Sequence, residues 1–200
     1  MKIAIVHIKR KAFKKTFQIQ NAHVIVLLIA GRKEQEIDIT IRLTNAGSRA
    51  DIIGLVTASD SDSITLHTRQ YHGSRETTSN LLVKSLLADA ASFTYDGAIR
   101  VEPKAQKTDA YQRNENLLLS DQAHAESKPK LEILANDVRC THGATIGSVR
   151  DDELWYLASR GIEKKEAIAL IARGFLGSVV EKISDRDAQK KVYAFINSAI

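Results

Sequence analysis

The alternation of apolar and polar residues predicts a β-rich region through most of this 200-residue chain. Residues 23–30 form a continuous apolar run that ends at Gly31, which predicts a strand buried on both faces. Residues 36–43 alternate between apolar and polar side chains, which predicts a half-buried strand. Short strand-like segments and polar turns, one of them at Asp96-Gly97, continue to Val138. Because no strand is followed by a long amphipathic helix, the pattern favours a sandwich, a barrel or a β-helix.

The hydrophobic period changes after Gly147 from that of strands to that of helices. Residues 148–151 have the spacing of a helix capping box. Helical patterns follow over residues 151–160, 163–183 and 184–199. The sequence therefore predicts two domains, a β region over residues 1–147 and a small helical domain over residues 148–200.

The net charge of +5 does not indicate a nucleic-acid-binding face. Six of the 29 basic residues lie within residues 2–15, and the rest of the chain carries 23 basic against 24 acidic side chains. The chain shows no interleaved aromatic platform of the kind that proteins binding single strands use. We therefore expect no nucleic-acid partner, and the absence of an 18-residue apolar run predicts no membrane span. A single cysteine forms no internal disulfide and suits a reducing compartment, so we expect a cytoplasmic location.

Candidate chemistry lies in the segment that contains this single cysteine, Cys140, two residues before His142. Residues 138–142 read as an extended segment that Gly143 and Gly147 break. Side chains two apart in a strand share a face, so the thiol and the imidazole would lie side by side. These donors suit iron and zinc. Two ligands do not complete a metal site unless another chain supplies further ligands. The alternative is a buried thiol and a hydrogen-bonded histidine at the end of a sheet.

The motif CTHGATIG at residues 140–147, followed by DDELWYLASRGI, resembles the SufB/SufD family of iron–sulfur cluster assembly scaffolds. The resemblance extends over about residues 67–184, and the Cys-x-His-Gly pattern is of the SufD type. It implies a right-handed parallel β-helix (a β-solenoid) followed by a small C-terminal helical domain. Proteins of this type carry a large region before this core, so the chain resembles their C-terminal half.

The resemblance also implies a function for the candidate residues. Family members are scaffolds and not enzymes, and they build an iron–sulfur cluster that they hold transiently with a partner subunit. The position of His142 lies at the interface with a SufB-like subunit, which supplies a facing cysteine, and Cys140 is its less certain neighbour. A SufC-like ATPase docks against the C-terminal helices. A second copy of this chain is an alternative to the SufB-like partner.

Two further functional hypotheses remain open from the residues themselves. One is a metal-dependent enzyme that uses Cys140 and His142 together with His67 or His72. The other is a purely structural β-solenoid that mediates oligomerisation. Nucleotide binding is not expected, because the glycine-rich HGATIG segment lacks the Gly-Lys-Ser/Thr ending of a phosphate loop.

Overall fold

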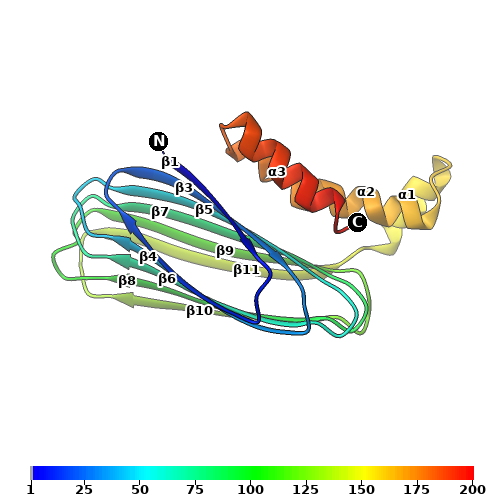
Figure 1. Cartoon of the computed structure of the whole chain (residues 1–200), viewed down its shortest axis with the longest axis horizontal. Coiled ribbons are helices and arrows are strands. Elements are labelled where there is room, and N and C mark those ends of the chain that lie inside the picture. The colour runs from blue at the N-terminus through cyan, green and yellow to red at the C-terminus, as the bar shows by residue number, and fades with distance from the viewer. Residues whose placement is uncertain (1) are drawn as a thin grey trace.

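The computed structural model describes residues 2–200, which fold into stacked β-strands followed by helices (Figure 1). The strands of this part of the chain are β1 (Lys2–Ile8), β2 (Ala12–Ile19), β3 (Ala22–Ala30), β4 (Glu34–Leu43), β5 (Arg49–Ala58), β6 (Ser63–His72), β7 (Thr78–Leu87), β8 (Ser92–Val101), β9 (Thr108–Leu118), β10 (His124–Ile133) and β11 (Val138–Ser148). The helices are α1 (Asp151–Ser159), α2 (Lys164–Gly177), the 3-10 turn η1 (Val180–Lys182) and α3 (Arg186–Asn197).

The strands belong to two parallel sheets, and the chain passes from one sheet to the other after each strand. The odd-strand sheet has the order β1-β3-β5-β7-β9-β11, and the even-strand sheet has the order β10-β8-β6-β4-β2. Neighbouring strands are one coil apart in sequence: Ile52 pairs with Leu81, 29 positions on, and Ser92 pairs with His124, 32 positions on. The predicted parallel β-helix is confirmed, and its coil length varies enough to hide the repeat in the sequence.

The two clearest strand predictions match the buried faces of this solenoid. Ile37, Ile39, Ile41 and Leu43 of β4 are at most 1% exposed and face the space between the sheets. Residues 24–29 of β3 are buried on both sides. One side of β3 packs between the sheets and the other contacts the C-terminal helices, which explains the continuous apolar run.

The C-terminal helices pack on the outer face of the odd-strand sheet, outside the stacked coils (Figure 1). Lys84 of β7 links the sheet to α2, because its ammonium group donates to the carbonyl oxygen of Phe175 at 2.9 Å and to Ser178 Oγ at 2.8 Å. The prediction of one helix over residues 163–183 was wrong: α2 ends at Gly177, and the chain tightens into η1. No helix among residues 2–200 is long and apolar enough to cross a membrane.

Two further local predictions were wrong for identifiable reasons. Asp96 and Gly97 form no turn and lie inside β8. The Tyr95 ring lies over Gly97, where a Cβ atom would come within 2.4 Å of Tyr95 Oη, so the glycine permits close packing. The capping box expected at residues 148–151 is displaced, since β11 extends to Ser148 and the backbone N–H of Arg150 instead donates to Glu153 Oε2 at 3.3 Å.

Candidate functional site: the open end of the solenoid

The last coil of the solenoid, formed by β10 and β11, is uncovered within residues 2–200. β10 pairs only with β8, and β11 pairs only with β9, so each presents an unpaired edge. Large apolar side chains are exposed here, with Leu131 38% and Ile146 49% exposed. Unpaired strand edges are ready to pair with another chain, and exposed apolar groups favour burial by one.

Cys140 and His142 lie on the same face of β11, as their spacing predicts. Their ladder partners in β9 are Ala110 and Gln112, which are buried at 1% and 0% exposure. Both β11 side chains therefore face the space between the sheets. Because no further coil covers them, Cys140 is half-buried and His142 is exposed.

The surroundings of Cys140 disfavour its thiolate form. Cys140 packs against an apolar cluster that includes Val101 and Ala135. Burial raises the pKa of the Cys140 thiol, and the Asp109 carboxylate raises it further, against a hydrogen bond with the Ala110 backbone that lowers it. The isolated chain thus lacks the electropositive setting that activates a nucleophilic cysteine.

β11 continues through both glycines that were expected to end it. Gly143 pairs with Arg113 and Gly147 pairs with Leu117, so the prediction that these glycines break the strand was wrong. The Asn116 side chain reinforces the pairing, since its Nδ2 donates to the carbonyl oxygen of Thr145 at 3.0 Å. β11 is therefore an unbroken strand, held to β9 by both backbone and side-chain hydrogen bonds.

A buried polar layer lies beneath the candidate pair and was missed by the sequence analysis. Gln112, Asn114 and Asn116 of β9 point between the sheets and are 0–4% exposed. Gln112 Nε2 donates to the carbonyl oxygen of Gly97 at 3.1 Å, and Asn116 accepts from Ser85 Oγ at 2.7 Å. Residues 111–116 are all polar or tyrosine, so they gave no apolar period by which an inward face could be recognised.

The two histidines considered as additional ligands lie on opposite faces of β6. His72 is fully buried, with Nδ1 2.8 Å from Thr77 Oγ1 and Nε2 2.8 Å from Ser79 Oγ. His67 faces outward between Glu36 and Asp96, each at 3.7 Å. Both ring nitrogens of His72 are occupied by hydrogen bonds, so His72 is a structural histidine.

The predicted ligands Cys140 and His142 are of types that bind iron, but they are too few to hold it alone. Thiol and imidazole are iron ligands, but no group of three or more His, Cys, Asp or Glu side chains suited to a metal ion occurs in the described part of the chain. Cys140 and His142 thus require ligands from outside residues 2–200 to complete a metal coordination sphere.

These features define a class of protein: a parallel β-solenoid whose last strand, β11, carries one thiol and one imidazole. A family model described as "SUF system FeS cluster assembly, SufBD core domain" matches residues 4–175. The chain belongs to this SufBD core family.

Curated relatives agree with this family. The chain is 36% identical over 134 residues to the iron–sulfur cluster assembly protein SufD of Escherichia coli, a match that covers 67% of this chain and 30% of the relative. It is 33% identical over 182 residues to an iron–sulfur cluster assembly SufBD family protein of Mycobacterium bovis, covering 87% of this chain and 45% of the relative. SufD of Bacillus subtilis is 30% identical over 161 residues, covering 80% and 37%. The chain spans less than half the length of each of these relatives.

Proposed function

We propose that this chain is a scaffold subunit of the Suf system, and that its open coil is one half of a site where an iron–sulfur cluster is built. The proposed division between a solenoid domain and a helical docking domain falls at the end of β11, which extends one residue past Gly147 to Ser148. The observation that carries the proposal is that Cys140 and His142, a thiol and an imidazole of the types that bind iron, share one face of β11, a strand with an unpaired edge. The cluster is the scaffold's product, held transiently and then released.

A SufB-like subunit is the proposed partner at this edge. It would extend the two sheets by strand pairing, cover Leu131 and Ile146, and supply the missing ligands. A site shared between two chains can release its cluster when the chains move apart, which suits a scaffold. A second copy of this chain could cover the same surface, but it would bring only another thiol and imidazole.

The helical domain is the proposed dock for a SufC-like ATPase. Trp155 and Tyr156 of α1 are 74% and 54% exposed, and Leu170 of α2 is 49% exposed. By contrast, Phe175 and Val179 pack in the core between the helices and the sheet. The α1 surface is therefore the stronger candidate for contact with the ATPase, and ATP hydrolysis in that subunit would drive rearrangement of the scaffold.

Co-purification tests the two docking surfaces separately. A tagged chain co-expressed with a SufB-like subunit and a SufC-like ATPase is expected to purify with both. Ile146→Asp places a charge on the open coil and should release the SufB-like subunit but retain the ATPase. Trp155→Asp should have the opposite effect. Purification of the unaltered chain without either subunit would contradict the proposal, and self-association that Ile146→Asp abolishes would favour the homodimer.

Anaerobic reconstitution with iron and sulfide tests the two ligands. In the assembled complex, His142→Ala is expected to reduce cluster formation more than Cys140→Ser, because His142 is exposed toward the partner and Cys140 is half-buried. The reverse order would refute this ranking. If the chain alone bound stoichiometric zinc and converted a substrate, the alternative of a metal-dependent enzyme would replace the scaffold.

A further inference from the structure

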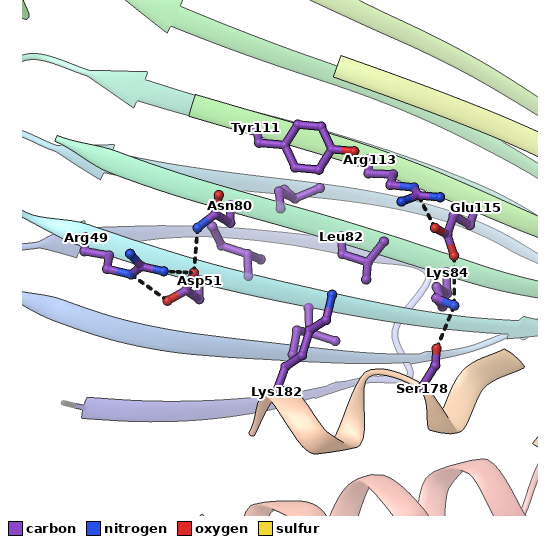
Figure 2. Close-up of a pocket in the computed structure, with 13 residues that line it drawn as sticks. Arg49, Asp51, Asn80, Leu82, Lys84, Tyr111, Arg113, Glu115, Ser178 and Lys182 are labelled. Atoms are coloured by element: carbon purple, nitrogen blue, oxygen red, sulfur yellow. Dashed lines mark hydrogen bonds and ion pairs between the residues drawn. The ribbon is translucent and has the colours of Figure 1, made fainter. Parts of the chain in front are cut away.

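A cavity of about 600 Å³ lies on the outer face of the odd-strand sheet, separate from Cys140 and His142 (Figure 2). Its floor is formed by β5, β7 and β9, and one wall is formed by the end of α2 and by η1. This volume is within the range of small-molecule sites in proteins. The candidate iron ligands face the opposite side of this sheet, so the cavity is independent of the proposed cluster site.

Both carboxylates in the cavity are already engaged by neighbouring side chains. Asp51 Oδ2 accepts from Arg49 Nε at 2.9 Å, and Asp51 Oδ1 accepts from Arg49 Nη2 at 3.0 Å and from Asn80 Nδ2 at 2.9 Å. Glu115 Oε1 lies 2.6 Å from Arg113 Nε, and Glu115 Oε2 lies 2.8 Å from Lys84 Nζ. Figure 2 shows these two networks on opposite sides of the cavity. The lining therefore offers few strong acceptors to a ligand.

Lys84 is also fully engaged by neighbouring groups. An ammonium group has three donors, and Lys84 Nζ has three acceptors: Glu115, the carbonyl oxygen of Phe175 and Ser178 Oγ. The ammonium also lies 4.3 Å from the centre of the Phe175 ring. Lys84 thus joins sheet to helix and leaves no donor for a ligand.

The remaining hydrogen-bonding capacity consists mainly of donors. Lys182 of η1 has no side-chain hydrogen bond or ion pair among residues 2–200 and points toward the region between the two networks (Figure 2). Arg113 contacts Glu115 through Nε, and its terminal nitrogens have no hydrogen-bond acceptor among residues 2–200. Four cationic side chains line the cavity against two carboxylates, so it carries an excess of two positive charges.

Apolar surface lies between these charges. Ile53 and Leu82 belong to the floor. The Tyr111 side chain lines the cavity on β9, next to the strand that carries Leu82 (Figure 2). A ligand that matched this lining would combine an apolar or aromatic body with an acidic group that accepts hydrogen bonds.

We propose that this cavity binds a small organic anion that bears a phosphate or carboxylate group. The acidic group contacts Lys182 and the terminal nitrogens of Arg113, and the apolar body lies against Leu82 and Tyr111. Charge-assisted hydrogen bonds of this kind are the strong ones in proteins.

Titrations of the full 200-residue chain followed by backbone-amide NMR test the proposal with four probes. Phenyl phosphate and benzoate carry the two acidic groups on an aromatic body, benzyl alcohol is the neutral analogue, and inorganic phosphate lacks the apolar body. We expect saturable shifts at amides of β7, β9 and η1 with both aromatic anions, the phosphate binding more tightly because the cavity has two excess charges. Benzyl alcohol should bind at least about tenfold more weakly than phenyl phosphate.

Two variants locate the site. Lys182→Gln should weaken phenyl phosphate binding about tenfold. Lys164→Gln, which removes another exposed lysine outside the cavity, should leave binding unchanged. No saturable shift, equal binding of the neutral analogue, or unchanged affinity in Lys182→Gln would each overturn the proposal. Equal affinity for inorganic phosphate and phenyl phosphate would contradict an organic ligand.

Discussion

The interior of the solenoid differs between its early and late coils. Around β4 it is filled by isoleucines such as Ile39 and Ile41, at most 1% exposed. Around β9 it is filled by hydrogen-bonded amides such as Asn114, and at β11 it opens onto His142. The early coils can therefore supply stability, whereas the last coil exposes the candidate ligand His142 and apolar side chains. The comparison indicates that the well-packed early coils can maintain the fold while the last coil remains uncovered.

The largest expected effect separates the two regions by stability. Ile39 and Leu131 both point inward from the even-strand sheet, but Ile39 is 1% exposed and Leu131 is 38% exposed. Ile39→Ala should lower the free energy of unfolding by about 2–5 kcal/mol, through lost burial and the cavity left behind. Leu131→Ala should cost about 1 kcal/mol or less. Urea unfolding of the two variants measures both values.

Equal destabilisation by the two substitutions would show that the last coil is packed as tightly as the early coils. A larger cost of Leu131→Ala at higher protein concentration would indicate self-association through the open end.

A smaller effect is expected from His72, at the point where the interior becomes polar. Burial lowers the pKa of His72 from 6.5 to about 4. Between these pH values the unfolded chain therefore binds more protons than the folded chain. The contribution of the neutral His72 to the free energy of unfolding is complete above pH 6.5 and is lost as the pH falls toward 4. By pH 5 the loss should reach roughly 2 kcal/mol. Urea unfolding at pH 7.5 and pH 5 measures it.

The matched control for this pH dependence is the other histidine of β6. His72→Gln should remove the roughly 2 kcal/mol difference between the two pH values. His67→Gln should leave most of it, because His67 lies on the outer face between two carboxylates. An unchanged pH dependence in His72→Gln would show that His72 is not buried in its neutral form.

Local patterns predicted the strands with the simplest environments. β4 alternates because one face is buried, and β3 is continuously apolar because sheets and helices cover both faces. The coil repeat was not predictable, since the turns use non-glycine residues with positive φ, such as Lys33, Asp60 and Asp89, and the coil length varies. The end of α2 at Gly177 lies beside Lys84, which is far away in sequence and donates hydrogen bonds to Phe175 and Ser178.

The candidate site was predictable in its local part only. Strand geometry placed Cys140 and His142 on one face, and the structure agrees. Their exposure depends on β11 being the last strand of its sheet within residues 2–200, which no local pattern reveals. The amides beneath them are buried because they bond to neighbouring coils, and such partners are distant in sequence.

The most direct measurement is the cluster content of the assembled complex with one histidine removed at either end of the same sheet. His142 on β11 and His7 on β1 are both exposed, and β1 and β11 are the two edge strands of the odd-strand sheet. After anaerobic reconstitution with the SufB-like subunit and the ATPase, His142→Ala should lose most of the bound iron and sulfide, and His7→Ala should retain it. Equal cluster content in the two variants would contradict a cluster site at the open end of the solenoid.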